Sequence, residues 1–222
     1  MRANGPRRGH PARTVEADAP APGAAKAAWR SWARALRRAW AADPQGRARD
    51  ENALRAWLEG WDAWRDARCV LAYVAFADEL DPIAPAVRAG GRRGPTLATT
   101  RTVGPGEPLE IRAWIEPFER HPFGFLQPRA DAPAVDPASI DLVLVPGLAF
   151  DVRGARLGYG QGHFDRLLPG LPLRAPRVGV AHDAWVVERL PAEAHDVPMT
   201  HLLTPSGLRT LPAFGLSDAA RP

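Results

Sequence analysis

Six short apolar runs constrain the fold of this chain more than any other feature of its sequence. Several are continuous rather than alternating, which is typical of strands buried on both faces of a sheet. Helical patterns separate some of them, notably at residues 83–89 and 163–168. This rhythm predicts an α/β protein, a three-layer α/β/α sandwich with a largely parallel, mixed central sheet of the Rossmann-like kind. The predicted strands are CVLAYVAF (69–76), PTLATT (95–100), LEIRAW (109–114), IDLVLV (140–145), RVGVAH (177–182) and THLLT (200–204).

Two amphipathic helices are predicted ahead of the first strand. The first begins at Ala24, and one of its faces collects large apolar side chains, namely Trp29, Trp32, Leu36 and Trp40. Arg34, Arg37 and Arg38 lie largely off that face. After a break at Asp43-Pro44, the second helix is expected from about Asp50, with a buried stripe made of Leu54, Trp57, Leu58, Trp61 and Trp64. We expect these large flat side chains to anchor both helices on the sheet.

The length and composition predict one domain with a tail. Residues 1–23 are rich in Arg, Pro, Ala and Gly and carry almost no large apolar groups, so we expect a disordered basic tail. Residues 24–222 are long enough to form a single domain with its own core. The Pro-rich stretch at 117–137 lacks periodicity and is predicted to be a long surface connection close to the functional site.

The charge is unevenly distributed, which limits the classes of partner. Residues 1–49 contain 11 Lys and Arg against 3 Asp and Glu, whereas residues 50–222 contain 18 against 22. Loose contact of the basic tail with nucleic acid stays open, but no base-reading motif is present, so we expect no specific nucleic-acid partner. No run approaches the roughly 20 apolar residues of a membrane span. With no secretory signal pattern and Cys69 as the only cysteine, we expect a monomeric cytoplasmic protein.

The stretch RLGYGQGHFDRLL (156–168) is the strongest candidate for a binding site. Its three glycines alternate with other residues, and it follows the buried strand IDLVLV at the sheet edge where ligands of open α/β sheets bind. A strand, a glycine-rich loop and a helix start together suit phosphate. Arg156 and Arg166 supply matching charge, and Asp165 is placed to hold a cation between phosphates. A glycine-rich turn without a ligand is the alternative, because the pattern is neither GxxxxGK[ST] nor GxGxxG.

Further motifs flank this stretch in a recognisable order. They are KAAWR (26–30), AYVAF (72–76) followed by Glu79-Leu80-Asp81, PGLAFD (146–151) with Gly154 and then RLGYG (156–160) through Asp165-Arg166, LPAEAHD (190–196) and LLTP (202–205). In order and spacing they resemble the 5-formyltetrahydrofolate cyclo-ligase family, also called 5,10-methenyltetrahydrofolate synthetases. The resemblance extends from about residue 24 to residue 206.

The resemblance implies an ATP- and Mg²⁺-dependent ligase with a small-molecule folate substrate. In that reaction ATP phosphorylates the formyl oxygen of 5-formyltetrahydrofolate, N10 closes the ring to 5,10-methenyltetrahydrofolate, and ADP and phosphate are released. Such a transfer depends on positioning and charge neutralisation more than on covalent help from the protein. Two alternatives stay open: an ATP-binding relative with a different substrate, and a non-catalytic phosphate-binding or interaction protein.

The resemblance also assigns roles to individual residues. The catalytic set is Lys26, Arg156, Tyr159 and Asp165, and the metal ligands are Asp165 and Asp196. Substrate contacts are expected from Arg30, Val74 and Glu79. ATP contacts are expected from Lys26, Ala27, Ala28, Trp29, Arg30, Arg156, Leu157, Gly158, Tyr159, Gly160, Gln161, Gly162, His163 and Phe164.

Some positions are unusual in this chain. Lys26 is its only lysine, which indicates that a compact point charge matters there, although drift on a solvated helix face is the alternative. His163 stands in the glycine-rich loop where the family commonly carries tyrosine. Three further residues depart from the family pattern: Gln127 replaces a glutamate, Trp185 a common glutamine, and Thr200 a common aspartate. We expect these departures to affect substrate contacts, rate and pterin placement, and to leave the phosphate and magnesium residues intact.

Overall fold

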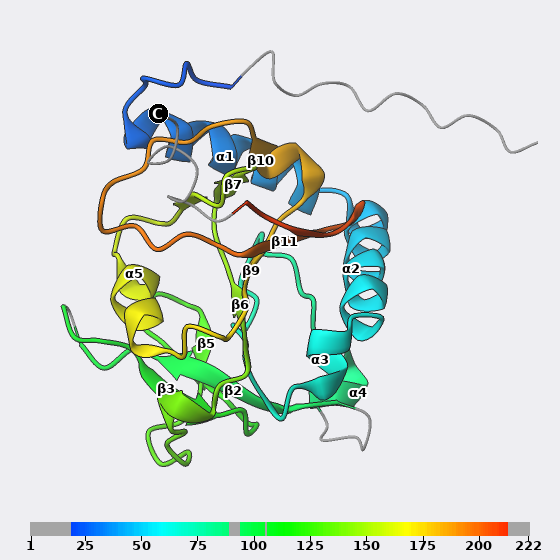
Figure 1. Cartoon of the computed structure of the whole chain (residues 1–222), viewed down its shortest axis with the longest axis vertical. Helices are drawn as coiled ribbons and strands as arrows, with labels where there is room; N and C mark the ends of the chain where they lie inside the picture. The colour runs from blue at the N-terminus through cyan, green and yellow to red at the C-terminus, as the bar shows by residue number, and fades with distance from the viewer. Residues whose placement is uncertain (1–18, 89–93, 105, 213–222) are drawn as a thin grey trace, which may run out of the picture.

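The computed structural model of the chain describes residues 19–88, 94–104 and 106–212 (Figure 1). Most of the predicted N-terminal tail, residues 1–18, therefore lies outside the described residues. Among the described residues, every helix falls short of the length and apolar character that crossing a bilayer requires.

A seven-stranded sheet forms the centre of the molecule, with the strand order β12-β11-β9-β6-β1-β2-β3. Neighbouring strands run parallel except at the two edges, where β3 and β12 are antiparallel to their partners. Each of the six predicted runs supplies one strand of this sheet, and β12 is its one strand that was not predicted. The bounds are β1 Cys69–Leu71, β2 Thr96–Arg101, β3 Glu110–Ala113, β6 Leu142–Val145, β9 Arg177–Val180, β11 His201–Thr204 and β12 Gly207–Thr210.

Helices cover both faces of this sheet, which confirms the three-layer α/β/α prediction. Figure 1 shows α2 and α3 on one side and α5 on the other, with α1 lying across one end. The helices are α1 Lys26–Ala41, α2 Pro44–Glu59, α3 Asp62–Asp66, α4 Pro85–Arg88 and α5 His163–Leu167, and the short 3₁₀ turns are η2 Pro137–Ser139, η3 Leu168–Gly170 and η4 Asp183–Trp185.

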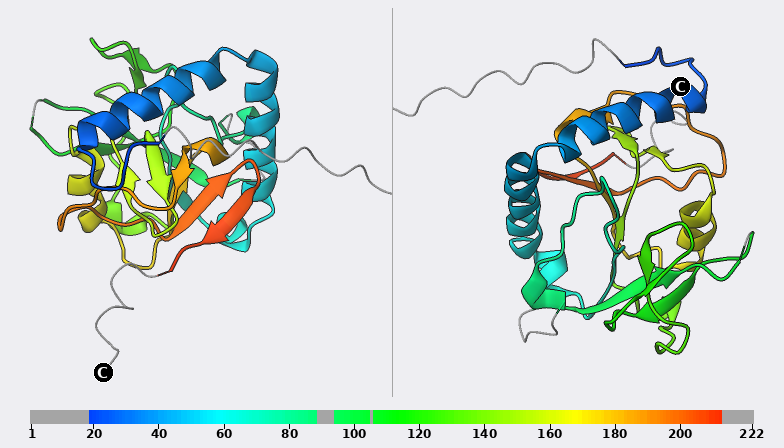
Figure 2. Two further views of the ribbon diagram at one scale, coloured as in Figure 1. Left: turned by 90° about the horizontal axis from the view of Figure 1, so that it is seen from above. Right: turned by 180° about the vertical axis from the view of Figure 1, so that it is seen from behind.

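Two small sheets accompany the central one. Strands β7 (Ala149–Asp151), β8 (Arg156–Leu157) and β10 (Val186–Val187) form a three-stranded sheet next to α1, as Figure 2 shows. Within the predicted loop at 117–137, β4 (Glu119–Arg120) and β5 (Leu126–Gln127) pair as a ribbon. Strands of two or three residues are too short to produce a periodic sequence pattern, so the sequence did not predict them.

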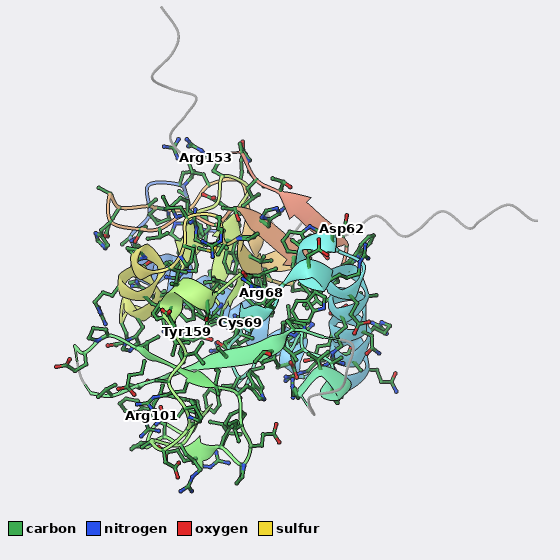
Figure 3. All side chains as sticks on the ribbon, turned by 60° about the horizontal axis from the view of Figure 1, so that its bottom comes forward. Asp62, Arg68, Cys69, Arg101, Arg153 and Tyr159 are labelled. Atoms are coloured by element: carbon green, nitrogen blue, oxygen red, sulfur yellow. The ribbon has the colours of Figure 1, made fainter. Side chains whose placement is uncertain are left out.

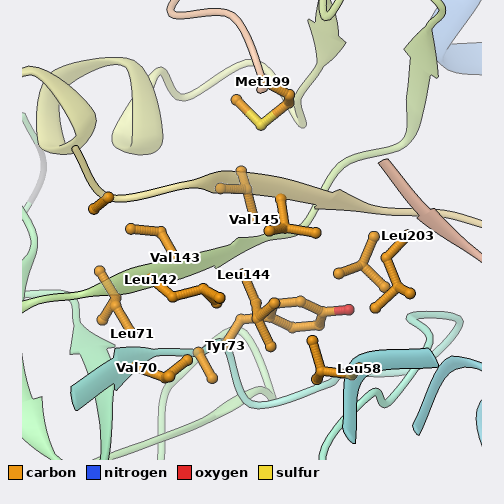
Figure 4. Packing of buried hydrophobic residues seen from close by; sticks show 14 of the residues in the cluster. Leu58, Val70, Leu71, Tyr73, Leu142, Val143, Leu144, Val145, Met199 and Leu203 are labelled. Carbon is orange, nitrogen blue, oxygen red and sulfur yellow. The ribbon is translucent and has the colours of Figure 1, made fainter. Parts of the chain in front are cut away.

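The main core joins the central strands to α2 and also to Leu167 of α5 and Leu168 after it (Figure 4). All four residues of β6 are fully buried, as are Leu54 and Leu58 of α2. Burial of each such side chain contributes roughly 1.5–3 kcal/mol relative to an exposed position. Continuous burial of β6 explains why its sequence is apolar without alternation.

The second helix ends at Glu59, so Trp61 and Trp64 of the predicted stripe lie beyond it. It differs from the prediction in two further ways. It begins at Pro44 rather than near Asp50, because the Asp43 carboxylate accepts a hydrogen bond from the backbone N–H of Gly46 at 3.0 Å and caps the helix. Trp57 was expected in the buried stripe, but it is 48% exposed and its Nε1 donates to the carbonyl oxygen of Pro205 at 3.2 Å. The hydrogen bond gives the indole a surface position that spacing alone did not indicate.

Candidate active site

The backbone of the glycine-rich loop, between β8 and α5, is approached closely by two arginines. Gly160 and Gly162 have φ values of +104° and +64°, a region that glycine adopts without strain. A Cβ atom at Gly158 would lie 2.9 Å from Nη1 of Arg156, and one at Gly160 would lie 3.5 Å from Cζ of Arg30. The missing side chain at Gly158 therefore leaves space for the Arg156 guanidinium, whereas glycine at 160 suits the positive φ.

The sequence suggested that the glycine-rich loop follows the central strand β6 directly, but the structure differs. The hairpin β7–β8 intervenes between β6 and the loop, and the helix after the loop, α5, has only five residues. A helix this short contributes a small dipole. Nearby arginine side chains therefore account for more of the positive charge at the loop than the sequence had implied.

Arg156 and Asp165 form a partly buried ion pair at the loop. Nη2 of Arg156 donates to Oδ1 of Asp165 at 2.8 Å, and the two side chains are 7% and 20% exposed. The guanidinium carbon lies 5.6 Å from the ring centre of Phe164. Nε of Arg156 is buried and has no hydrogen-bond partner among the described residues, so this donor is left unsatisfied.

The remaining loop residues differ in exposure. Leu157 is buried in a second apolar cluster, Gln161 is exposed and Phe164 packs partly against the main core. Burial lowers the pKa of His163, and the charge of Arg166 adds to this effect. Both effects disfavour the charged form of the His163 ring.

Lys26, at the start of α1, joins the helix to the loop after β10. Its Nζ lies 3.0 Å from Oδ2 of Asp196 and 3.1 Å from Oε1 of Glu193. Burial opposes ionisation of Asp196, but the backbone N–H of Glu193 and the ammonium of Lys26 outweigh it, so the pKa of this carboxyl is lowered. His195 lies beside both carboxylates, and the ligand atoms of the three residues are within 4.8 Å of one another.

The other predicted ATP contacts on α1 divide between two environments. Nε of Arg30 donates to the carbonyl oxygen of Gly158 at 3.1 Å, which ties the helix to the glycine-rich loop. Ala27 and Ala28 are exposed. Trp29 is only 2% exposed and packs in the second apolar cluster, so its indole anchors α1 and is not free to contact ATP.

Glu79 and Tyr159 connect the predicted folate contacts to the glycine-rich loop. The Tyr159 hydroxyl donates to Oε1 of Glu79 at 3.0 Å, and Oε2 of Glu79 accepts from the backbone N–H of Phe76 at 3.1 Å (Tyr159 is labelled in Figure 3). Burial raises the pKa of Glu79 and also that of Tyr159. Val74, the third predicted substrate contact besides Glu79 and Arg30, is half-buried and packs against the main core.

Arg37 is a charged residue of the site that the sequence reasoning placed wrongly. It was assigned to the outer side of α1, but it is 1% exposed. Nη1 donates to the carbonyl oxygen of Gly147 at 2.5 Å, and Nη2 donates to the carbonyl and to Oδ1 of Asp78 at 2.9 and 3.1 Å. The buried positions of α1 are Trp29, Ala33 and Arg37. Their four-residue spacing is the signal that could have located this arginine.

The residues Gln127, Thr200 and Trp185, which depart from the family pattern, all make contacts within the protein. Gln127 donates to Oε1 of Glu119 and accepts from the backbone N–H of Thr102, both at 3.1 Å. The Thr200 hydroxyl accepts from the backbone N–H of Arg177 at 2.9 Å. The Trp185 ring is 1% exposed, and its centre lies 4.7 Å from Cζ of Arg37. Of the three, Trp185 therefore has the most direct connection to the site.

The donor set around the loop fits a magnesium-bound nucleotide. Each predicted metal ligand is paired with a predicted ATP-binding cation, Asp165 with Arg156 and Asp196 with Lys26. Mg²⁺ is usually held by one or two carboxylates together with phosphate oxygens, and cations beside it bind the remaining phosphate charge. Either carboxylate, Asp165 or Asp196, could hold the ion, while Lys26, Arg30 and Arg156 could contact the phosphates.

Known proteins resemble this chain in sequence and in architecture. The model of the 5-formyltetrahydrofolate cyclo-ligase family matches residues 22–205. The 5-formyltetrahydrofolate cyclo-ligase of Mycolicibacterium smegmatis is 36% identical over 164 residues, which cover 70% of this chain and 82% of the relative. The Escherichia coli K12 enzyme of the same name is 42% identical over 82 residues, 36% of this chain and 45% of the relative.

Solved structures agree with these sequence matches. The NMR structure of Aquifex aeolicus 5,10-methenyltetrahydrofolate synthetase superposes with a TM-score of 0.72 at 28% identity, covering 84% of this chain and 92% of that one. The Mycoplasma pneumoniae 5,10-methenyltetrahydrofolate synthetase superposes with a TM-score of 0.67 at 16% identity over 82% and 99% of the two chains, a likeness of fold. Because the family model and the mycobacterial relative both match over most of the chain, this protein belongs to the 5-formyltetrahydrofolate cyclo-ligase family and is a ligase of that family.

Proposed function

We propose that this chain converts 5-formyltetrahydrofolate to 5,10-methenyltetrahydrofolate with consumption of ATP, dependence on Mg²⁺ and release of ADP and phosphate. Membership of the family supports cyclo-ligase activity in general. The names of the relatives supply the substrate class, and the residues of the site supply the argument for the nucleotide and the metal.

One observation carries this proposal: the Tyr159 hydroxyl donates a hydrogen bond to Oε1 of Glu79 at 3.0 Å. Tyr159 belongs to the loop proposed to hold phosphate, whereas Glu79 belongs to the turn proposed to hold the folate. Phosphoryl transfer requires the donor phosphate and the acceptor oxygen to be held next to each other. The contact supports a single site in which nucleotide and folate meet.

The chemistry divides between the bound groups and the side chains of the chain. ATP supplies the phosphoryl group that turns the formyl oxygen into a leaving group, and Mg²⁺ neutralises phosphate charge. Arg156, Arg30 and Lys26 bind and orient the phosphates through charge-assisted hydrogen bonds. Glu79 would orient the pterin ring by accepting hydrogen bonds from its N–H groups. The protein contributes positioning and electrostatic stabilisation, which this class of transfer mainly requires.

The test is an absorbance assay for methenyltetrahydrofolate formation from 5-formyltetrahydrofolate, with and without Mg-ATP and with a chelator. Product should form only when ATP and Mg²⁺ are both present. Asp165→Asn should keep the fold, judged by circular dichroism and Tm, and lower kcat/KM by about 100-fold, the scale on which a lost electrostatic contact reduces turnover. Asp131→Asn is the matched control, because Asp131 also pairs with an arginine but is 73% exposed.

Each result has a defined meaning. Equal kcat/KM for Asp165→Asn and wild type would reject the metal role of this carboxylate. ATP binding without turnover of the folate would indicate a different substrate for this chain. The monomeric state and the cytoplasmic location stay predictions, and sedimentation analysis of the purified protein checks the first of them.

A further inference from the structure

The turn that carries Glu79 has an unusual backbone. Ala77 has a φ of +52°, and it is the only residue other than glycine with a positive φ among the residues that the structure describes. A side chain with a Cβ atom is disfavoured in this left-handed region, so the conformation must be held by other contacts. Strained backbone of this kind concentrates at functional sites.

Side chains from neighbouring elements hold this turn through its backbone. Each carbonyl group of residues 77–81 accepts a hydrogen bond from a side chain. Arg47 of α2 donates to the carbonyls of residues 77 and 79 at 2.8 and 3.1 Å. Arg37 of α1 donates to that of residue 78 at 2.9 Å. Tyr73 donates to that of residue 80 at 2.6 Å, and Arg55 of α2 to that of residue 81 at 3.1 Å. Five successive carbonyls are thus fixed from outside the turn.

Arg37 occupies a special place among these donors, because it also contacts other parts of the site. Its guanidinium carbon lies 4.7 Å from the ring centre of Trp185 and 6.0 Å from that of Tyr159. Its Nη1 reaches the carbonyl oxygen of Gly147, in the segment after β6. Removing a guanidinium from water is costly even when it is paired, so full burial of this side chain indicates a specific task.

We propose that Arg37 is a positioning residue of the folate side of the site: it holds the turn at 77–81 so that the Glu79 carboxylate and the Tyr159 hydroxyl face the pterin ring. Arg37 itself need not touch the substrate. The proposal rests on the proposed function, because it takes Glu79 as the residue that binds the folate.

The electrostatics of the turn agree with this task. Burial raises the pKa of Glu79, and the positive charge of Arg37 opposes this rise, as do the Phe76 N–H and the Tyr159 hydroxyl. An ionised carboxylate accepts hydrogen bonds from a pterin N–H group more strongly than a neutral carboxyl does.

The main test replaces Arg37 by lysine and measures KM for the folate and for ATP separately. Lysine keeps the charge but lacks the planar fork of arginine, so it cannot donate hydrogen bonds to Gly147 and to Asp78 at the same time in this geometry. We expect the folate KM to rise about tenfold, equivalent to about 1.4 kcal/mol of binding free energy, while the ATP KM changes less than about twofold. Calorimetric titration with 5-formyltetrahydrofolate alone should show the same tenfold weakening.

Arg112→Lys is the matched control. Arg112 also bridges a carboxylate and a carbonyl, since Nη2 donates to Oε2 of Glu110 at 2.7 Å and Nη1 to the carbonyl oxygen of Ala132 at 2.9 Å, but it lies on the edge strand β3. Both KM values should stay within about twofold of wild type in this variant, whatever its Tm. An equal rise of both KM values in Arg37→Lys, or an unchanged folate KM, would overturn the proposal.

A second variant decides the question if Arg37→Lys does not fold. Asp78→Ala removes one acceptor of Arg37 from a side chain that is 22% exposed and leaves the carbonyl contacts in place. It should raise the folate KM about threefold with an unchanged ATP KM, and an unchanged folate KM would contradict the role. Failure of the wild-type protein to bind or convert 5-formyltetrahydrofolate is a different result, which removes the proposed function and with it this inference.

Discussion

Single charges determine much of the site, and Lys26 is the clearest case. It is the only lysine in the sequence, and its Nζ lies close to two carboxylates, at 3.0 Å from Asp196 and 3.1 Å from Glu193. An ammonium group can approach two acceptors, and later a phosphate, from several directions. A guanidinium has a fixed planar fork and matches fewer of these arrangements. The local geometry therefore supports the view that lysine was retained here for its shape as well as its charge.

Lys26→Arg tests this view. We expect kcat/KM for ATP to fall about tenfold, because the substituted side chain cannot reproduce the point contact with phosphate and Asp196. The control is Arg34→Lys, the reverse exchange at an exposed position of the same helix. Steady-state kinetics at varied ATP concentration provides the measurement, and normal ATP dependence of the Lys26→Arg variant would refute the point-charge argument.

Contacts between elements fix the short strands that lead to the site. Strand β1 has only three residues, and its start is held by Asp141, which precedes β6. Oδ2 of Asp141 accepts from the backbone N–H groups of Arg68 at 2.9 Å and Cys69 at 3.2 Å. The hydrogen bond from Arg68 lowers the pKa of Asp141 below its ordinary value, with a further contribution from Cys69. One carboxylate, just before β6, thereby holds the start of the neighbouring strand β1.

Asp141→Asn should lower the free energy of unfolding at neutral pH by about 1 kcal/mol, because an amide oxygen accepts less strongly than a carboxylate. Since the folded-state pKa is lowered, the contribution is fully present above the ordinary Asp pKa of about 4 and is lost as the pH falls through the folded-state value. Urea unfolding of both proteins between pH 7 and pH 3 measures this difference. Asp66→Asn, at the exposed end of α3, should show no such trend, and a difference that persists unchanged at pH 3 would disprove the assignment.

The whole molecule depends on the central strand β6, because all four of its side chains lie in the main core. Every residue of β6 is fully buried, between β1 on one side and β9 on the other. Figure 4 shows Leu144 among side chains that come from several strands and from α2. Leu144 contributes to the continuous core that positions α1, the turn at 77–81 and the glycine-rich loop relative to one another.

Leu144→Ala should destabilise the fold by about 2–5 kcal/mol, since it leaves a cavity in a core that cannot collapse locally. Leu173→Ala makes the same chemical change at a position that is 90% exposed, and it should alter stability by no more than about 0.5 kcal/mol. Urea midpoints of the two variants and the wild type provide the comparison. Similar losses in both variants would show that the core does not depend on β6 as described.

The sequence by itself determined the elements that a local pattern encodes. The six apolar runs specified six of the seven strands of the central sheet, and the spacing of Trp29 and its neighbours specified α1. It also specified the glycine-rich loop, because positive φ values at Gly160 and Gly162 require residues without a side chain. Period and residue type are properties of neighbouring positions, so they can be recognised before the chain is folded.

Only the tertiary structure decided which side chains meet and which charges are buried. Arg37 looked like a solvent-facing arginine, and its burial depends on Asp78 and Gly147, which are 41 and 110 residues away. Tyr159 meets Glu79 across 80 residues, and Lys26 meets Asp196 across 170. A buried charge is stable only where its partners converge, and that convergence is produced by the crossing of distant segments, which no local pattern records.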